Sequence, residues 1–125
     1  MKFSDGTPFD AQAVKWNFDR LLALGRAPVG LYEPVREVTV QDSHTVVFTM
    51  KRPYAPFLSL MASWQGALFM SPSYLQANEK GGDRGSAWMH NHTVGIGPYV
   101  REQWAPDDQV VFSEEWSLSG ALEPR

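Results

Sequence analysis

The sequence contains no cysteine, and this absence removes several classes of function at once. Without thiol groups the chain has no disulfide framework, no thiolate metal site and no cysteine nucleophile. No stretch approaches the ~20 consecutive apolar residues that a membrane-spanning helix requires. A basic segment followed by an apolar run is also missing near the N-terminus, so we expect no export signal within this chain.

Positive charge is scarce as well. The 11 Lys and Arg residues are outnumbered by 14 Asp and Glu residues, which gives a formal net charge of -3. A surface that binds nucleic acid needs clustered basic side chains, and here Lys51-Arg52 is the only adjacent basic pair. We therefore exclude nucleic acid as a main partner. Aromatic residues are plentiful instead, with five Trp, which indicates a dense core or a surface for stacking.

The clearest local pattern is a helix over residues 11–24. Asp10 is a good N-cap because its carboxylate can accept hydrogen bonds from the first turn. Phe9 and Val14 occupy the two positions of a hydrophobic staple. Apolar side chains recur at helical spacing at Val14, Phe18, Leu21 and Leu22. Gly25 is typical of the residue that follows a helix C-terminus.

The rest of the chain alternates short helices with hairpins. Residues 37–41 and 45–50 are β-branched and roughly alternating around a turn, so they predict an antiparallel hairpin with Val38, Val40, Val46, Phe48 and Met50 on its buried face. Residues 98–104 and 109–112 predict a second hairpin. Shorter elements are expected between them: a helix at 55–61, a buried strand at 67–70, a helix at 72–79 capped by Ser71, and a polar glycine-rich loop at 79–86. This mixture favours an α+β fold.

No arrangement of catalytic side chains is evident. His90 and His92 form the only histidine cluster, and a metal site would need further ligands, for which Asp83 and Glu102 are the nearest candidates in the chain. We interpret this segment as a polar loop. A small metal-dependent enzyme would depend on these two histidines alone, so we expect a protein that is not an enzyme and has no cofactor.

Several segments in order resemble one family of binding proteins. They are Phe3–Ala11 (FSDGTPFDA) with Val14 and Phe18, residues 45–58 (TVVFTMKRPYAPFL), Ala67–Pro72 (ALFMSP), Val94–Tyr99 (VGIGPY) and Trp104–Asp108 (WAPDD). Together they are similar to the family 5 extracellular solute-binding proteins, the receptors of ABC importers for oligopeptides, dipeptides and nickel. Ile96 stands where the family usually has Thr, and Asp107 where it usually has Gly.

The resemblance implies a domain organisation. Family members have a two-lobed periplasmic-binding-protein type II fold. Residues 1–97 would correspond to the small subdomain of the first lobe, and residues 98–116 to strands that return to the main sheet of that lobe. Residues 117–125 depart from the family pattern. We therefore expect the chain to be a fragment of a longer protein.

The resemblance also implies a function. The parent protein would capture peptides or nickel complexes by lobe closure, in the periplasm or at the cell surface, and deliver them to a membrane permease. In nickel-binding members, arginines and a tryptophan of this subdomain hold the metal complex. Arg26, Trp64 and the neighbouring Gln65 are therefore the candidate ligand-binding residues, and a peptide-like ligand is the default expectation.

One alternative remains open from the residues alone. A free-standing interaction domain could dock a partner through exposed aromatic side chains. Unpaired strand edges on residues 98–113, or their pairing in a dimer, would instead favour the fragment.

Overall fold

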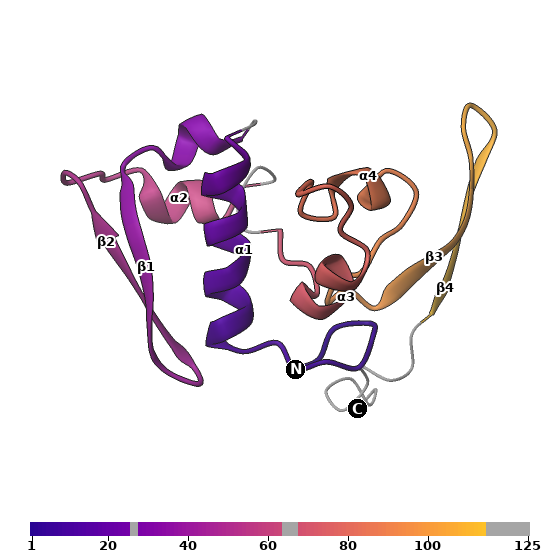
Figure 1. Cartoon of the computed structure of the whole chain (residues 1–125), viewed down its shortest axis with the longest axis horizontal. Helices are drawn as coiled ribbons and strands as arrows, with labels where there is room; N and C mark the ends of the chain where they lie inside the picture. The colour runs from indigo at the N-terminus through magenta and orange to yellow at the C-terminus, as the bar shows by residue number, and fades with distance from the viewer. Residues whose placement is uncertain (26–27, 64–67, 115–125) are drawn as a thin grey trace. The chain divides into compact units, whose positions relative to one another are not determined.

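The computed structural model describes residues 1–25, 28–63 and 68–114 (Figure 1). In order, its elements are α1 (Ala11–Leu24), the 3₁₀ turn η1 (Val29–Tyr32), β1 (Val35–Asp42), β2 (Thr45–Met50), α2 (Phe57–Met61), α3 (Pro72–Ala77), α4 (Ser86–Met89), β3 (Tyr99–Ala105) and β4 (Gln109–Glu114). Within these ranges both sheets are two-stranded and antiparallel, β1 with β2 and β3 with β4. The α+β class predicted from the sequence is confirmed.

The chain divides into two compact units. The first, which we call the helix–hairpin unit, comprises Asp10–Phe69. The second, the terminal unit, combines Met1–Phe9 with the described residues from Met70 onward. The subdomain boundaries expected at residues 97 and 116 stay a prediction, and residues 117–125 lie outside the described part of the chain.

Helix α1 has the ends that its sequence predicts. The carboxylate of Asp10 accepts a hydrogen bond from the backbone N–H of Ala13 at 3.0 Å. Gly25 terminates the helix in the left-handed conformation, with φ of 62°. Glycine suits this position because a side chain with a Cβ atom is strained there.

The β1–β2 hairpin packs beside α1 and contributes to the core of the helix–hairpin unit (Figure 1). Val38 pairs with Phe48, and Val40 pairs with Val46. Since directly opposed residues point to the same face of a sheet, these side chains share one surface. Val38 is buried, and the core cluster also includes the partly buried Val46, Phe48 and Met50.

Phe18 lies at the centre of this core, with 3% of its surface exposed. Its ring makes edge-to-face contacts with Tyr32 at 5.4 Å and with Phe48 at 4.9 Å between centroids. Such pairs add to the free energy gained by burial of the rings. Burial also raises the pKa of the Tyr32 phenol.

The strand predicted at 67–70 is wrong for the residues that the structure describes. Residues 68–70 join neither sheet, and 74% of the Leu68 side chain is exposed. An apolar run is compatible with a strand, but strand formation also needs a neighbouring chain to complete the backbone ladder. Helix α2, in contrast, forms where it was predicted, and its Phe57 ring lies 5.2 Å from Phe48.

The terminal unit is built on a tight N-terminal loop and two short helices. Phe3 is fully buried and makes an edge-to-face contact with Phe9 at 5.5 Å. The predicted α3 is confirmed, with Ser71 as its N-cap and Pro72 in the first turn. Helix α4 was not predicted; it begins at Ser86, the last residue of the expected glycine-rich loop.

The side chain of Asp83 explains why α4 forms. Its two carboxylate oxygens accept hydrogen bonds from the backbone N–H groups of Lys80, Gly85 and Ala87, all at 2.9 Å. Gly85 is required there because it has φ of 74°, and an added Cβ would lie 3.0 Å from the carbonyl oxygen of Leu75.

Hairpin β3–β4 also forms where the sequence predicts it. Asp107 in its turn has a left-handed backbone, with φ of 62°. This conformation gives a physical reason for the glycine that the family usually has at this position, because glycine adopts it without strain.

Candidate functional site

The three predicted ligand-binding residues, Arg26, Trp64 and Gln65, lie outside the described residues. Arg26 directly follows Gly25, the residue that ends α1. Trp64 follows Ser63, whose hydroxyl donates to the carbonyl oxygen of Leu60 at 2.7 Å just beyond α2. Their role in binding therefore stays a prediction.

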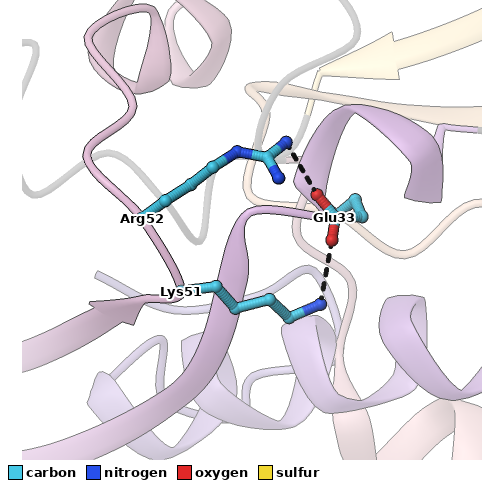
Figure 2. Close-up of polar contacts among 3 residues, drawn as sticks. All are labelled: Glu33, Lys51 and Arg52. Carbon is cyan, nitrogen blue, oxygen red and sulfur yellow. Dashed lines mark hydrogen bonds and ion pairs between the residues drawn. The ribbon is translucent and has the colours of Figure 1, made fainter.

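A charged cluster joins the segment before β1 to the end of β2 (Figure 2). The carboxylate of Glu33 pairs with Lys51 Nζ at 3.3 Å and with Arg52 Nη2 at 3.1 Å. About half or more of each side chain is exposed, so solvent screens these pairs and each contributes little stability. With two cations and one anion, the cluster keeps an excess positive charge that can attract an anionic group. The sequence showed the basic pair but not its partner, which lies 18 and 19 positions away.

A second polar cluster lies inside the terminal unit. One carboxylate oxygen of Asp5 accepts from the backbone N–H of Thr7 at 2.9 Å and from its hydroxyl at 2.6 Å. The other accepts a short hydrogen bond from the hydroxyl of Ser71. Partial burial raises the pKa of Asp5, but the hydrogen bonds from Ser71 and Thr7 outweigh it and leave the pKa below its ordinary value. Both carboxylate oxygens thus accept hydrogen bonds from the terminal unit itself, and we assign this carboxylate a structural role.

The two histidines of the H-x-H segment lie at the end of α4. His90 is the C-cap residue, and the His92 ring stacks on Trp88 at 4.2 Å between centroids. His92 Nδ1 lies 2.9 Å from the carbonyl oxygen of Trp88 and must be the donor, because a carbonyl can only accept. Across the described ranges, no three His, Asp or Glu side chains are grouped to hold a metal ion.

The β1–β2 turn contains the side-chain types of a catalytic triad, but not the chain of hydrogen bonds that a triad requires. Ser43 Oγ lies 2.8 Å from His44 Nδ1. The carboxylate of Asp42, however, accepts from the backbone N–H of His44 at 2.8 Å and not from its ring. This bond is the main reason that the pKa of Asp42 is lowered. The three residues are exposed and consecutive, so the arrangement stabilises the turn.

The family model described as "Bacterial extracellular solute-binding proteins, family 5 Middle" matches residues 1–115. The chain belongs to this family. The resemblance found in the sequence is thereby confirmed.

Curated family 5 proteins share substantial sequence identity with the chain. The probable D,D-dipeptide-binding periplasmic protein DdpA of Escherichia coli K12 is 37% identical over 111 residues, which cover 89% of this chain and 21% of DdpA. The glutathione-binding protein GsiB of Salmonella typhimurium is 38% identical over 113 residues, 88% of this chain and 20% of GsiB. The chain thus spans about a fifth of the length of these relatives.

Solved structures extend the likeness to the fold. NikA from Brucella suis, in complex with Fe(III)-EDTA, has a TM-score of 0.71 and 27% identity, over 95% of this chain and 23% of NikA. The periplasmic oligopeptide-binding protein of an ABC transporter from Thermotoga maritima has a TM-score of 0.73 and 24% identity, and the match covers 94% of this chain and 21% of the Thermotoga chain. These neighbours are two-lobed periplasmic binding proteins, as the family resemblance implied.

Proposed function

We propose that this chain forms part of a solute-binding receptor of an ABC importer. The observation that carries the proposal is the family match over residues 1–115, together with the structural likeness to NikA over 95% of the chain. Such a receptor would bind its ligand by closure of two lobes, and the permease would recognise the closed state. Closure requires no covalent chemistry, so the chain acts in binding and not in catalysis.

A peptide-like ligand is the class that the relatives favour. The names of DdpA and GsiB refer to a D,D-dipeptide and to glutathione, and two structural neighbours are described as oligopeptide-binding or as bound to a peptide. Arg26 would pair with a ligand carboxylate, Trp64 would cover an apolar group and Gln65 would bond to a peptide group. A nickel complex is the alternative that the family resemblance implies, and NikA is described in complex with a chelated metal ion, Fe(III)-EDTA.

The site of action follows from the same relatives. DdpA is described as periplasmic and the family as extracellular, so we place the receptor in the periplasm or at the cell surface, where it meets a membrane permease. In the described residues, none of the helices has the length and apolar character needed to cross a membrane. We assign residues 1–97 to a small subdomain and 98–116 to strands of the main lobe.

One observation favours a second candidate, a free-standing interaction domain. Tyr99, Trp104 and Phe112 on hairpin β3–β4 are large, apolar and exposed. In that case they would dock a partner directly. Sedimentation of the chain over a range of concentrations helps to distinguish the two candidates, because a dimer formed through the open edges of the hairpin favours a receptor fragment, whereas a stable monomer favours the free-standing domain.

The experiment that tests the receptor function is a chimera. In full-length E. coli DdpA, the matching 111-residue segment is replaced by the corresponding residues of this chain. Binding of D-alanyl-D-alanine, glutathione and nickel(II) is then measured by isothermal titration calorimetry. We expect one of the two peptide-like probes to bind.

Variants of the chimera test the site. Arg26→Ala and Trp64→Ala should each weaken binding by about fivefold or more without lowering the unfolding temperature. Gln12→Ala, an exposed change on α1, is the control and should leave binding unchanged. A chimera that unfolds cooperatively but binds none of the three probes would overturn the proposed function.

A further inference from the structure

The chain passes between its two compact units at two places, Phe9–Asp10 and Phe69–Met70. Thr7 lies just before the first of these connections, and Ser71 lies just after the second. The hydroxyl oxygens of Thr7 and Ser71 are 3.2 Å apart, although 64 positions separate the two residues. Side chains of the terminal unit therefore bring together two connections that are distant in the sequence.

The carboxylate of Asp5 bridges the two hydroxyl groups. One of its oxygens accepts hydrogen bonds from the backbone and the side chain of Thr7, and the other accepts from the hydroxyl of Ser71. Hydrogen bonds to a charged carboxylate are roughly twice as strong as those between neutral groups. Ser71 is fully buried, so water does not compete for its hydroxyl group. We call Asp5, Thr7 and Ser71 the connection clamp.

The backbone beside the clamp is stiff, because Thr7 and Ser71 are each followed by a proline. Proline fixes its own φ angle and restricts the residue before it to extended conformations. Ser71 has such a conformation, with φ of -60° and ψ of 119°. Backbone hydrogen bonds from Ser4 to Gly95 at 2.9 Å and from Ser71 to Val94 at 3.3 Å hold the clamp within the terminal unit. Substitution of a clamp side chain does not remove these two bonds, because they join backbone atoms.

We propose that the connection clamp restricts how the helix–hairpin unit moves relative to the terminal unit, and that Asp5 and Ser71 are thereby positioning residues for ligand binding. Each connection is a single chain whose φ and ψ angles can rotate, and joining the two connections removes much of this freedom. The candidate ligand-binding residues Arg26, Trp64 and Gln65 belong to the helix–hairpin unit by their positions in the sequence. A loosely attached unit has to be ordered when the ligand binds, which weakens binding. The effect on binding rests on the proposed function, whereas the restriction of movement does not.

The absence of native cysteine allows pairs of spin labels to be placed at chosen positions of the full chain. Labels at the exposed positions Thr39→Cys on β1 and Ala87→Cys on α4 report the distance between the two units by double electron–electron resonance. We expect one narrow distance distribution in the labelled chain, and its width should increase at least about twofold in Asp5→Ala and in Ser71→Ala. The two substitutions combined should broaden the distribution no further, because they break the same link.

Two controls separate movement of the units from unfolding. A label pair within the helix–hairpin unit, Gln12→Cys with Thr39→Cys, should keep its distribution width in both clamp variants. Asp108→Ala removes an exposed carboxylate of the terminal unit and should leave the distance between the units unchanged. Asp5→Ala also retains Ser71 as the cap of α3, so loss of the cap cannot explain its effect.

Equal widths in the labelled chain and in its clamp variants would overturn the inference. A distribution that is already as broad before the clamp is substituted would overturn it as well. Thr7→Val, which removes one hydroxyl group of the clamp, replaces any clamp variant that fails to fold.

The DdpA chimera tests the effect of the clamp on ligand binding. Ser71→Ala should raise the dissociation constant of the bound probe about threefold or more at a temperature where the variant is folded. Ser73→Ala, an exposed change in the same helix, is the control and should leave the constant unchanged. Broadened distances with an unchanged dissociation constant would overturn the positioning role. A chimera that binds no probe contradicts the proposed function, whereas broadened distances in the free chain still support the restriction of movement.

Discussion

The hydroxyl group of Ser71 donates a hydrogen bond to the carboxylate of Asp5, although 66 positions separate the two residues. The same buried oxygen accepts a hydrogen bond from the backbone N–H of Tyr74 at 3.3 Å. One hydroxyl group therefore caps α3 and holds the N-terminal loop against it. Two contacts that differ greatly in sequence distance depend on a single side chain.

Ser71→Ala should lower the free energy of unfolding by about 1–3 kcal/mol, because it removes the cap and leaves the Asp5 carboxylate without its buried donor. Urea unfolding followed by circular dichroism measures the effect. Ser73→Ala, an exposed change in the same helix, is the control and should stay within about 0.5 kcal/mol of the parent. Equal midpoints for the two variants would contradict the structural role of Ser71.

Asp5 should make the stability depend on pH in the acid range. Its pKa is lower in the folded state than in the unfolded chain, where it is about 3.9. Between the two values the unfolded state binds more protons. The contribution of Asp5 to stability is therefore complete above its pKa in the unfolded chain and is lost as the pH falls through its lower pKa in the folded state.

Asp5→Asn should consequently flatten the acid limb of a plot of urea midpoint against pH. The exposed Asp108→Asn is the control and should leave the limb unchanged, while Asp42 contributes its own acid dependence in all three proteins. Parallel acid limbs for Asp5→Asn and the parent chain would show that the carboxylate is not held by these hydrogen bonds.

Phe18→Ala should be among the most damaging single changes in the helix–hairpin unit. It removes a buried ring that contacts both Tyr32 and Phe48, and we expect a loss of about 3–5 kcal/mol. Leu58→Ala removes a side chain that is 78% exposed and should cost less than about 0.5 kcal/mol. Thermal unfolding compares them, with Phe18→Leu as a milder variant if Phe18→Ala fails to fold.

Glu33→Gln should have a small effect on the free energy of unfolding, although it removes two ion pairs. Because both pairs are exposed, the loss should be below about 1 kcal/mol and should shrink further in concentrated salt. Chemical unfolding in urea at low and high sodium chloride concentration tests this. A larger loss that persists in high salt would mean that the cluster is more than a surface contact.

Sequence motifs predicted some residues of the candidate sites and could not predict others. Arg26, Trp64 and Gln65 were selected from a family resemblance, and the family is confirmed, but the residues lie outside the described structure and their role stays a prediction. The ion pairs of Glu33 could not be found from the sequence, because no local pattern specifies which acidic residue meets a basic pair 18 positions away.

Helix α1 and both hairpins were determined by the sequence itself. Asp10 and Gly25 mark the ends of α1 through hydrogen bonds and backbone preferences that involve only near neighbours, and alternating β-branched residues around a short turn are enough to specify a hairpin. The tertiary structure alone decided the contact of Ser71 with Asp5, the absence of residues 68–70 from both described sheets and the face of the hairpin on which Trp104 lies. Each of these depends on which distant backbone or side chain is available as a partner, and local sequence patterns do not carry that information.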